Sequence, residues 1–587
     1  MSEYRIYSVN GPVVKVVGGK GLAMMDMVFA GDQQLIGEVV GVEGDMTTVQ
    51  VYEDTAGLAP GQPVTTTGSP MALMLGPGLL GNIFDGIARP LKSLEAISGP
   101  FLGRGVNIPA LDLSKKWDVE ITVKEGDPVK PGTLYAQCQE TSAILHRCLT
   151  PAGLNGTVTR VVPNGPYTVE DVLVEVTDAR GKVTQLKLAT RCTIRGARPI
   201  AQRLPIHRPL ITGQRILDTL FPIGKGGAAA IPGPFGAGKT MTQHQLAKWS
   251  DADIIVYLGC GERGNEMTQA LEEFSELKDP RTGLPLMNRT ILIANTSNMP
   301  VAAREASVYT GMTIAEYYRD MGYHVALMAD STSRWAEALR EISGRLEEMP
   351  AEEGFPAYLA SRLAEFYERA GYVETLEGKE GSVTVIGAVS PQGGDFSEPV
   401  TQNTKRFVRC FWALDRSLAY ARHFPSINWL NSYSEYTVDF KDWYSENVSP
   451  DFAPCRQRIA NLLREESQLM EIVKLIGSDI LPENQKLIME TARLIRLGFL
   501  QQNSYNPVDT YVPLKKQLLM MQTILRLYDG VKEGIDRSIP LSQYTATGIF
   551  DTVVKMKYEI PNEDLSKFDD YAAMIDKALE QVNTANS

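Results

Sequence analysis

Cysteine and histidine are scarce in this chain of 587 residues, and neither is arranged for a metal or redox site. The six cysteines are scattered and include no C-x-x-C pair, which argues against structural zinc and against a disulfide framework. The five histidines are also isolated and lack the spacing of metal ligands. This cysteine usage fits a reducing cytoplasm. The cysteines are Cys138, Cys148, Cys192, Cys260, Cys410 and Cys455.

Long apolar runs and excess positive charge are also missing. No apolar run reaches the ~18 residues that span a bilayer, and the longest candidate, residues 71–84, is broken by glycine and proline. Residues 1–5 have no signal-peptide core, so we expect membrane association only through partner subunits. The formal net charge of -12 argues against bulk attraction to nucleic acid or anionic lipid.

The length of the chain predicts several domains, and two regions near the N-terminus are rich in β-branched residues. Residues 1–72 place valine and isoleucine at short intervals between glycines, which predicts a small closed β-barrel. Residues 73–111 form a connection to the core. Residues 112–188 read as a β-rich insertion similar to a lipoyl-type barrel, without a lysine at the hairpin tip that would carry a cofactor. Asn155-Gly156 predicts a hairpin there.

The pattern changes to alternating strands and helices over residues 189–435. Short apolar runs at 254–258, 290–294, 324–328 and 383–386 suit a parallel sheet buried on both faces. Helical stretches such as 302–320 and 357–370 lie between them, so we expect an α/β RecA-like nucleotide-binding domain. Residues 436–587 keep helical spacing and predict a helical bundle.

A glycine-rich run follows a short apolar stretch at 228–231 and precedes a predicted helix at 239–249. It fits G-x-x-x-x-G-K-[ST], the phosphate-binding P-loop, and this strand–loop–helix context is what that motif requires. Backbone N–H groups would surround phosphate oxygens, Lys239 would reach the β- and γ-phosphates, and Thr240 would hold Mg²⁺. The predicted binding residues are Gly233, Pro234, Phe235, Gly236, Ala237, Gly238, Lys239 and Thr240.

Nucleoside triphosphate hydrolysis also needs an oriented water, a second metal anchor and positive charge near the transferred phosphoryl group. Asp330 ends an apolar strand, so we expect it to act on Mg²⁺ through water. Glu262, in a Gly-Glu-Arg-Gly run after another strand, is the predicted water-orienting residue. Arg263 and Arg334 are predicted to reach the phosphate.

Several motifs together resemble the catalytic A subunit of V/A-type rotary ATPases, in its bacterial and archaeal form. They are the runs at 232–240, 261–267, 329–341 and 390–399. The resemblance covers essentially the whole chain, including the insertion, which F-type β subunits lack. Eukaryotic vacuolar members usually carry cysteine inside the P-loop, where this chain has Ala237, so redox control through that position is not expected.

The resemblance implies further residues and partners. Phe424 falls where an aromatic ring stacks on adenine, Tyr505 where a second ring closes the pocket, and Glu266 near the metal. The substrates would be ATP and ADP with Mg²⁺. Non-catalytic B subunits would alternate with this chain in an A3B3 ring and supply an arginine finger in trans. Central shaft and peripheral stalk subunits would complete a complex at the cytoplasmic face of the membrane, transporting H⁺ or Na⁺, with no role for nucleic acid.

Three alternatives share the fold. A non-catalytic B subunit would lack the intact Gly-Lys-Thr of the P-loop. A Rho-like RNA translocase would be expected to show an aromatic and basic RNA-binding signature, which is missing here. An F-type β subunit or a secretion-system ATPase would be shorter and would lack residues 112–188.

Overall fold

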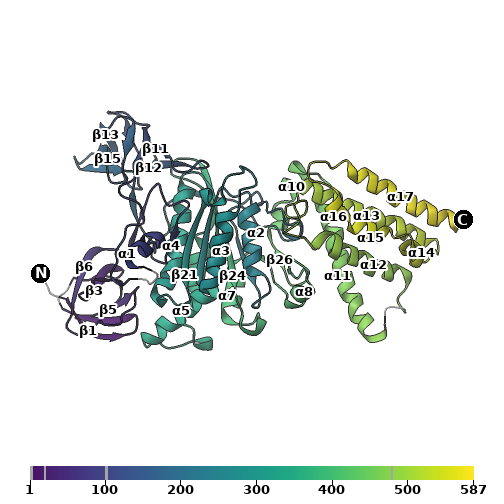
Figure 1. Ribbon diagram of the computed structural model, residues 1–587, viewed down its shortest axis with the longest axis horizontal. Helices are drawn as coiled ribbons and strands as arrows, with labels where there is room; N and C mark the ends of the chain where they lie inside the picture. Colours follow the sequence, from purple (N-terminus) through teal and green to yellow (C-terminus); the bar gives the residue numbers. More distant parts are fainter. Residues whose placement is uncertain (1–3, 19–20, 100–102, 478–479, 587) are drawn as a thin grey trace. The chain divides into compact units, whose positions relative to one another are not determined.

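The computed structural model describes residues 4–18, 21–99, 103–477 and 480–586. The chain forms two compact units. Unit 1 contains Met1–Ile206, Lys225–Ala230 and Ala252–Val408, and unit 2 contains His207–Gly224, Ile231–Asp251 and Arg409–Ser587. Figure 1 shows an α/β core, a β-barrel, a β-rich insertion and a helical region. The two units are described separately below.

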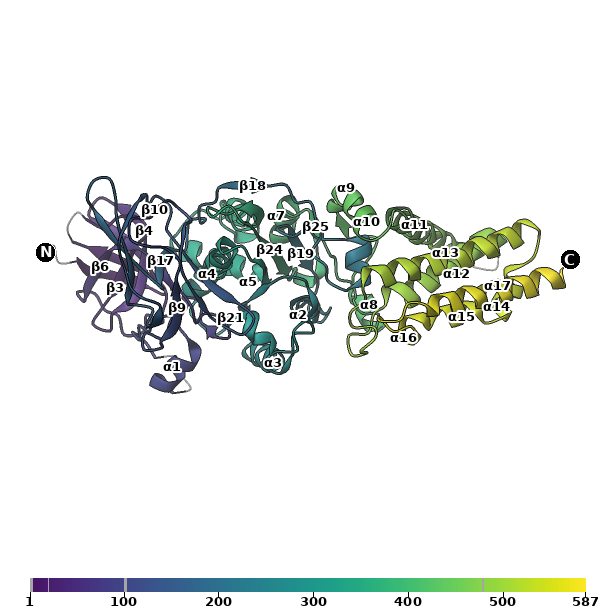
Figure 2. The same ribbon diagram turned by 90° about the horizontal axis from the view of Figure 1, so that it is seen from above.

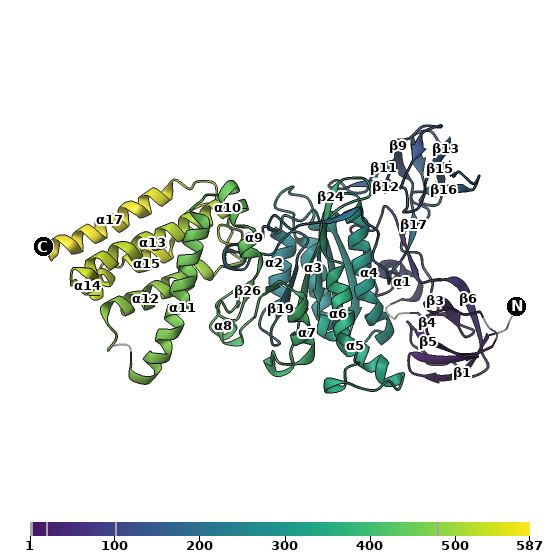
Figure 3. The same cartoon turned by 180° about the vertical axis from the view of Figure 1, so that it is seen from behind.

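Unit 1 begins with a closed six-stranded barrel in the order β1-β2-β5-β4-β3-β6. Alternate residues such as Val14, Val28, Val39 and Val49 point into its core and are fully buried, which confirms the barrel predicted from the valine spacing. Figure 3 shows the barrel at the N-terminal end of unit 1. The strands are β1 (Tyr4–Asn10), β2 (Val13–Val17), β3 (Asp26–Ala30), β4 (Leu35–Glu43), β5 (Met46–Val51) and β6 (Pro63–Pro70).

The insertion consists of two four-stranded antiparallel sheets, β10-β13-β15-β16 and β12-β11-β9-β14. The hairpin predicted at Asn155-Gly156 is wrong, because the strand that Gly156 begins pairs with β10 and β15 and not with the strand before it. A Cβ on Gly156 would lie 2.4 Å from the carbonyl oxygen of Thr177, so this glycine serves close strand packing rather than a turn. The strands are β9 (Trp117–Ile121), β10 (Pro128–Val129), β11 (Leu134–Gln139), β12 (Leu145–Leu149), β13 (Gly156–Val161), β14 (Gly165–Tyr167), β15 (Val172–Thr177) and β16 (Val183–Lys187).

The core of unit 1 is a parallel sheet in the order β24-β22-β20-β21-β8. Its strands are β8 (Ile83–Phe84), β20 (Ile254–Glu262), β21 (Thr290–Thr296), β22 (His324–Asp330) and β24 (Glu380–Val389). Nearly all of their residues are buried, as expected for a sheet covered on both faces. Helix α4 (Val301–Asp320) packs against β20 and β22. The α/β core predicted from the apolar runs is therefore present.

Smaller elements surround this sheet. Strand β23 (Gly371–Glu374) joins its edge antiparallel to β24, and β18 (Gln202–Leu204) pairs with β23. Strands β7 (Ala72–Leu75) and β17 (Thr190–Thr193) pair with each other. The remaining helices of unit 1 are α1 (Leu91–Ser98), α3 (Gly264–Glu276), α5 (Thr332–Arg345), α6 (Leu359–Glu368) and α7 (Pro399–Phe407).

Unit 2 holds the helix that follows the P-loop and the C-terminal helical region. Strand β19 (Ala228–Pro232), whose first three residues are counted in unit 1, leads into the P-loop, and α2 (Lys239–Trp249) follows the loop. Strands β25 (Cys410–Phe411) and β26 (Tyr433–Ser434) form an antiparallel pair. The C-terminal helices pack as a bundle, and Figure 2 shows α12, α13 and α17 running along one another. The helices are α8 (Arg416–Tyr420), α9 (Tyr436–Asp439), α10 (Lys441–Asn447), α11 (Phe452–Ile476), α12 (Glu483–Leu494), α13 (Leu514–Asp536), α14 (Leu541–Ala546), α15 (Ile549–Val554), α16 (Met556–Glu559) and α17 (Lys567–Ala585).

Within the described part of the chain, none of the helices combines the length and the apolar character needed to span a lipid bilayer.

Candidate active site

The P-loop occupies unit 2 and has the backbone that its sequence predicts. Gly236 and Gly238 take positive φ angles of 80° and 91°, a conformation that side-chain-bearing residues rarely adopt. A Cβ on Gly233 would lie 2.6 Å from Cβ of Leu414, so this glycine lets the loop pack closely. The Lys239 ammonium donates to the carbonyl oxygens of Gly233 at 2.8 Å and Pro234 at 3.3 Å. The lysine therefore folds back over the loop that it follows.

The remaining P-loop positions differ in exposure. Gly238 caps the N-terminus of α2, so Thr240 stands in the first turn of that helix, where the helix dipole favours an anion. Ala237 is buried, and its carbonyl oxygen accepts a hydrogen bond from the Ser426 hydroxyl. Phe235 is 70% exposed. The P-loop is thus anchored to the protein through Ala237, while the part around Phe235 stays accessible to solvent.

The two aromatic residues predicted to bind a base share one pocket in unit 2. Phe424 and Tyr505 line a cavity of ≈ 810 Å³ together with Gly238 of the P-loop. As whole residues they are 44% and 83% exposed, which is high for large aromatic residues. The cavity lies next to the first turn of α2, since Met241 and Thr242 also line it. A flat aromatic base could stack between these rings while its phosphates meet the P-loop.

Sequence reasoning missed other residues of this pocket. Tyr558, on α16, lines it from the C-terminal helical region, and Arg422 and Gln502 contribute polar groups. No motif marks these positions, because their role depends on contacts between segments far apart in sequence.

The two predicted carboxylates occupy unit 1, at the carboxyl ends of adjacent parallel strands. Glu262 is the last residue of β20 and Asp330 the last of β22, and the register pairs Gly259 with Asp330. Asp330 is 2% exposed, and one of its oxygens accepts a 3.4 Å hydrogen bond from the Tyr257 hydroxyl. The carboxyl edge of a parallel sheet is where ligands bind in this class of fold.

The environment of Glu262 favours its protonated form. Burial, the charge of Asp330 and a hydrogen bond with Glu266 together raise the pKa of the Glu262 carboxyl to about 7, against the opposing charge of Arg334. Two further carboxylates, Asp330 and Glu266, therefore act on the ionisation of Glu262. Such crowding of negative charge is relieved by a cation or by a bound proton.

The predicted arginines lie beside these carboxylates in unit 1. Arg334, on the first turn of α5, forms an ion pair with Glu337 at 2.8 Å, and this hydrogen bond raises the pKa of its guanidinium. Gly261 has a φ of 73°, and a Cβ there would lie 2.6 Å from Cβ of Arg334. The glycine before Glu262 therefore makes room for Arg334. Arg263 is exposed at the start of α3.

The available donors fit Mg²⁺ better than a transition metal. Across the residues that the structure describes, no three His, Cys, Asp or Glu side chains are grouped to hold a metal ion by themselves. Thr240 in unit 2 and the carboxylate of Asp330 in unit 1 offer oxygen ligands only. Mg²⁺ prefers oxygen and usually keeps several waters while binding substrate phosphates, so it does not need a cage of protein ligands.

Family models match four successive parts of the chain. Residues 6–68 match the ATP synthase alpha/beta family, beta-barrel domain, and residues 108–195 match the ATPsynthase alpha/beta subunit barrel-sandwich domain. Residues 213–434 match the ATP synthase alpha/beta family, nucleotide-binding domain. Residues 441–545 match the C-terminal domain of V and A type ATP synthase.

A solved structure shares the fold at low sequence identity. The assembled ATPase EscN from the enteropathogenic E. coli type III secretion system aligns with a TM-score of 0.64 and 21% identity, over 89% of this chain and 100% of that chain. At this identity the likeness concerns the fold alone.

Curated relatives are similar over nearly their full length. The V-type ATP synthase alpha chain of Halothermothrix orenii is 60% identical, with 97% of each chain covered. The corresponding A chain of the A-type ATP synthase of Methanopyrus kandleri is 54% identical, with 98% of each covered. Because this similarity includes the insertion and the C-terminal region, the chain belongs to the family of V-type and A-type ATP synthase alpha (A) chains.

Proposed function

We propose that Lys239, Thr240 and Glu262 carry the phosphoryl chemistry of this chain, which as a family member is the catalytic, ATP-binding subunit of a rotary ATPase. One observation carries the proposal. A P-loop with its lysine in place borders a cavity that presents two exposed aromatic rings, Phe424 and Tyr505. This arrangement provides for the phosphates and for the base of one nucleotide.

Nucleotide binding uses the residues of unit 2. The ammonium of Lys239 leaves the carbonyls of Gly233 and Pro234 and donates instead to the β- and γ-phosphate oxygens. The first turn of α2 adds backbone N–H groups and the positive end of its dipole. Phe424 and Tyr505 stack on the two faces of the adenine, so base and phosphates are held by separate parts of the same unit.

Hydrolysis uses charged residues of unit 1. Glu262 accepts a hydrogen bond from the attacking water and orients it toward the γ-phosphorus. Arg263 and Arg334 neutralise the charge that develops on the phosphoryl oxygens. Thr240 directly, and Asp330 through water, would hold Mg²⁺, which when bound neutralises charge on the β- and γ-phosphates.

The assembly proposed for the chain follows from its family. It alternates with B subunits in an A3B3 ring, in which each B subunit supplies an arginine finger in trans. The C-terminal helical region acts on central shaft subunits, and the insertion contacts a peripheral stalk. The chain is peripheral, at the cytoplasmic face of the membrane, within a membrane-anchored complex that couples ATP to H⁺ or Na⁺ transport through separate membrane subunits.

The isolated chain should bind ATP but hydrolyse it slowly. An arginine finger is worth about 10³ to 10⁵ in rate, so we expect turnover per site to be at least about 10³-fold lower in the isolated chain than in a ring reconstituted with B subunits. Phosphate release, measured at matched site concentrations and saturating ATP, checks this. Equal turnover per site in the two samples would contradict the arginine finger in trans, and stimulation by single-stranded RNA would instead favour a translocase.

The rate of the assembled enzyme should depend on the ionisation of Glu262. The ionised carboxylate is a stronger hydrogen-bond acceptor for the attacking water than the protonated group, and its pKa is raised to about 7. We therefore expect kcat/KM for ATP to fall as the pH is lowered through about 7, because kcat/KM reports the pKa values of the free enzyme.

The matched variant for this pH dependence is Glu266→Gln. Glu266 raises the pKa of Glu262 through a hydrogen bond and through its charge, so its removal should shift the acid limb to lower pH. The titration of ATP itself is identical in both samples and cancels in the comparison. An unchanged limb would mean that a group other than Glu262 controls the rate.

A further inference from the structure

A loop without regular secondary structure carries Tyr505 into the base pocket. This base loop, residues 501–512, lies in unit 2 between the helical turn Ile495–Leu500 and α13. Four of its side chains are buried, and three of these are polar: Gln502, Asp509 and Thr510. Because Val512 is the one apolar member, hydrophobic packing does little to fix the loop, and its position depends on polar contacts.

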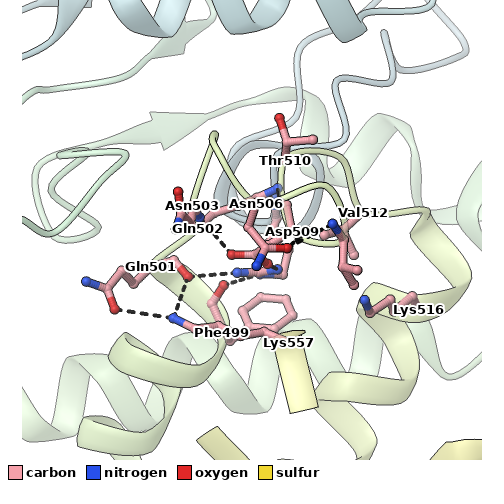
Figure 4. Close-up of polar contacts among 12 residues, drawn as sticks. Phe499, Gln501, Gln502, Asn503, Asn506, Asp509, Thr510, Val512, Lys516 and Lys557 are labelled. Atoms are coloured by element: carbon pink, nitrogen blue, oxygen red, sulfur yellow. Dashed lines mark hydrogen bonds and ion pairs between the residues drawn. The ribbon is translucent and has the colours of Figure 1, made fainter. Parts of the chain in front are cut away.

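The central polar contact is a fully buried ion pair between Arg215 and Asp509. Figure 4 labels Asp509 among the other polar residues of the loop. The guanidinium of Arg215 also donates to the carbonyl oxygen of Gln501 at 2.7 Å and to that of Phe499. The second carboxylate oxygen of Asp509 accepts from the backbone N–H of Asn503 at 2.7 Å. The pair thus ties the backbone before Ser504 and Tyr505, the loop tip, to Asp509, which follows the tip.

The backbone of Arg215 and of Gly213 forms further hydrogen bonds with the base loop. The backbone N–H of Arg215 donates to Oε1 of Gln502 at 2.8 Å, while Nε2 of Gln502 donates to the carbonyl oxygens of Gly213 and Asp509, both at 2.8 Å. The backbone N–H of Val512 returns to the carbonyl oxygen of Gly213 at 2.9 Å. The segment 213–215 therefore holds the base loop by hydrogen bonds near its start, at Gln502, and at its end, at Val512.

The base loop also contacts the P-loop helix and the C-terminal helices. Thr510 accepts a 3.1 Å hydrogen bond from the indole N–H of Trp249, the last residue of α2, and Tyr511 stacks on the same indole at 5.1 Å. On the other side, the ammonium of Lys557 on α16 donates to the carbonyl oxygen of Leu497 at 2.6 Å. It also donates to that of Gln501 at 3.2 Å (Figure 4). A displacement of the loop would therefore change the surroundings of the Trp249 indole.

We propose that Arg215 and Asp509 are positioning residues for the base pocket: they hold Tyr505 in place and so set the affinity for the base, while leaving phosphate binding unchanged. A buried ion pair seldom adds net stability compared with apolar side chains of similar size, but it fixes geometry. Here it fixes the backbone of a loop whose tip, with Tyr505 83% exposed, has little packing of its own. This inference rests on the proposed nucleotide-binding function.

The test compares two ligands that share phosphates but differ in the base. Dissociation constants for ADP and for inorganic triphosphate are measured by calorimetry on the full chain, on Asp509→Asn and on Arg215→Lys. Stacking of a base on an aromatic side chain contributes about 1 to 3 kcal/mol of binding free energy. We therefore expect ADP binding to weaken at least about fivefold in both variants. Affinity for inorganic triphosphate should stay within about twofold.

Two further samples separate positioning from general stability. The double variant Arg215→Gln/Asp509→Asn removes both charges of the pair together, so neither partner is left as a buried charge without the other, and it should fold and still lose selectivity for ADP. Asp279→Asn removes the carboxylate partner of Arg289 in an equally buried pair of unit 1, and it should leave both affinities unchanged. The fluorescence emission of Trp249 provides a further readout. It is obtained for each protein by subtracting the spectrum of the same protein carrying Trp249→Phe, and its emission maximum should shift in the base-loop variants.

The outcomes are distinct. Parallel loss of ADP and triphosphate binding, unchanged ADP binding, or failure of all three base-loop variants to fold would overturn the inference by assigning the pair a general structural role or none. Absence of ADP binding by the unsubstituted chain would instead overturn the proposed function itself.

Discussion

Replacement of Lys239 by alanine should abolish ATP turnover in the assembled ring and weaken nucleotide binding. The substitution removes the only side chain of the P-loop that can place a full positive charge on the β- and γ-phosphates. Loss of one preorganised charge-stabilising donor costs about 10² to 10³ in kcat, and the loss of binding comes in addition. Phosphate release and the affinity for inorganic triphosphate measure the two effects.

The matched control for Lys239→Ala is Lys248→Ala. Lys248 stands in the last turn of the same helix, α2, so the variant removes the same charge from the other end of the helix. We expect Lys248→Ala to leave turnover within about twofold, since the helix dipole favours a cation at that end by less than about 1 kcal/mol. Comparable rates in both variants would refute the role given to Lys239.

Substitution of Glu262 by glutamine should separate binding from chemistry. Glutamine keeps the size of the side chain but is a poorer acceptor for the attacking water, so we expect kcat to fall about 10² to 10⁴-fold. The affinity for ATP should be retained, because the phosphates are held by the P-loop. The fold should also tolerate the change, since burial and Asp330 already favour an uncharged group at this position.

Single-turnover phosphate release, together with ATP binding to the same sample, checks the effect of Glu262→Gln. Glu272→Gln on α3 is the control. It removes an exposed carboxylate that lies more than one helix turn beyond Glu266 on the same helix. Near-normal release by Glu262→Gln would transfer the water-orienting role to another residue. Loss of ATP binding would show that Glu262 contributes to binding the substrate and not only to the chemical step.

Much of the fold could be predicted because its signals are local. The apolar runs of β20, β21, β22 and β24 indicated buried parallel strands, and the P-loop fixed the start of α2. The Asn155-Gly156 hairpin was predicted wrongly, because a local turn signal cannot reveal that Gly156 lies against Thr177. Long-range strand pairing decided that position.

The site was predictable only where a motif or the family resemblance marked it. Phe424 and Tyr505 are types that usually pack in cores, and only the resemblance singled them out; in the structure both line one cavity. Nothing local distinguishes Arg215, Lys557 or Tyr558, which act through segments distant in sequence. Their arrangement follows from tertiary packing, which a single sequence does not display.

The closed N-terminal barrel limits how another protein can bind to it. Strand β1 pairs with β2 on one side and with β6 on the other, so no strand is left with an unpaired backbone edge. A neighbouring protein cannot extend such a sheet by adding a strand, and must be joined by side chains and turns alone. A partner that binds at the barrel can therefore dissociate and rebind without any exchange of backbone hydrogen bonds between strands.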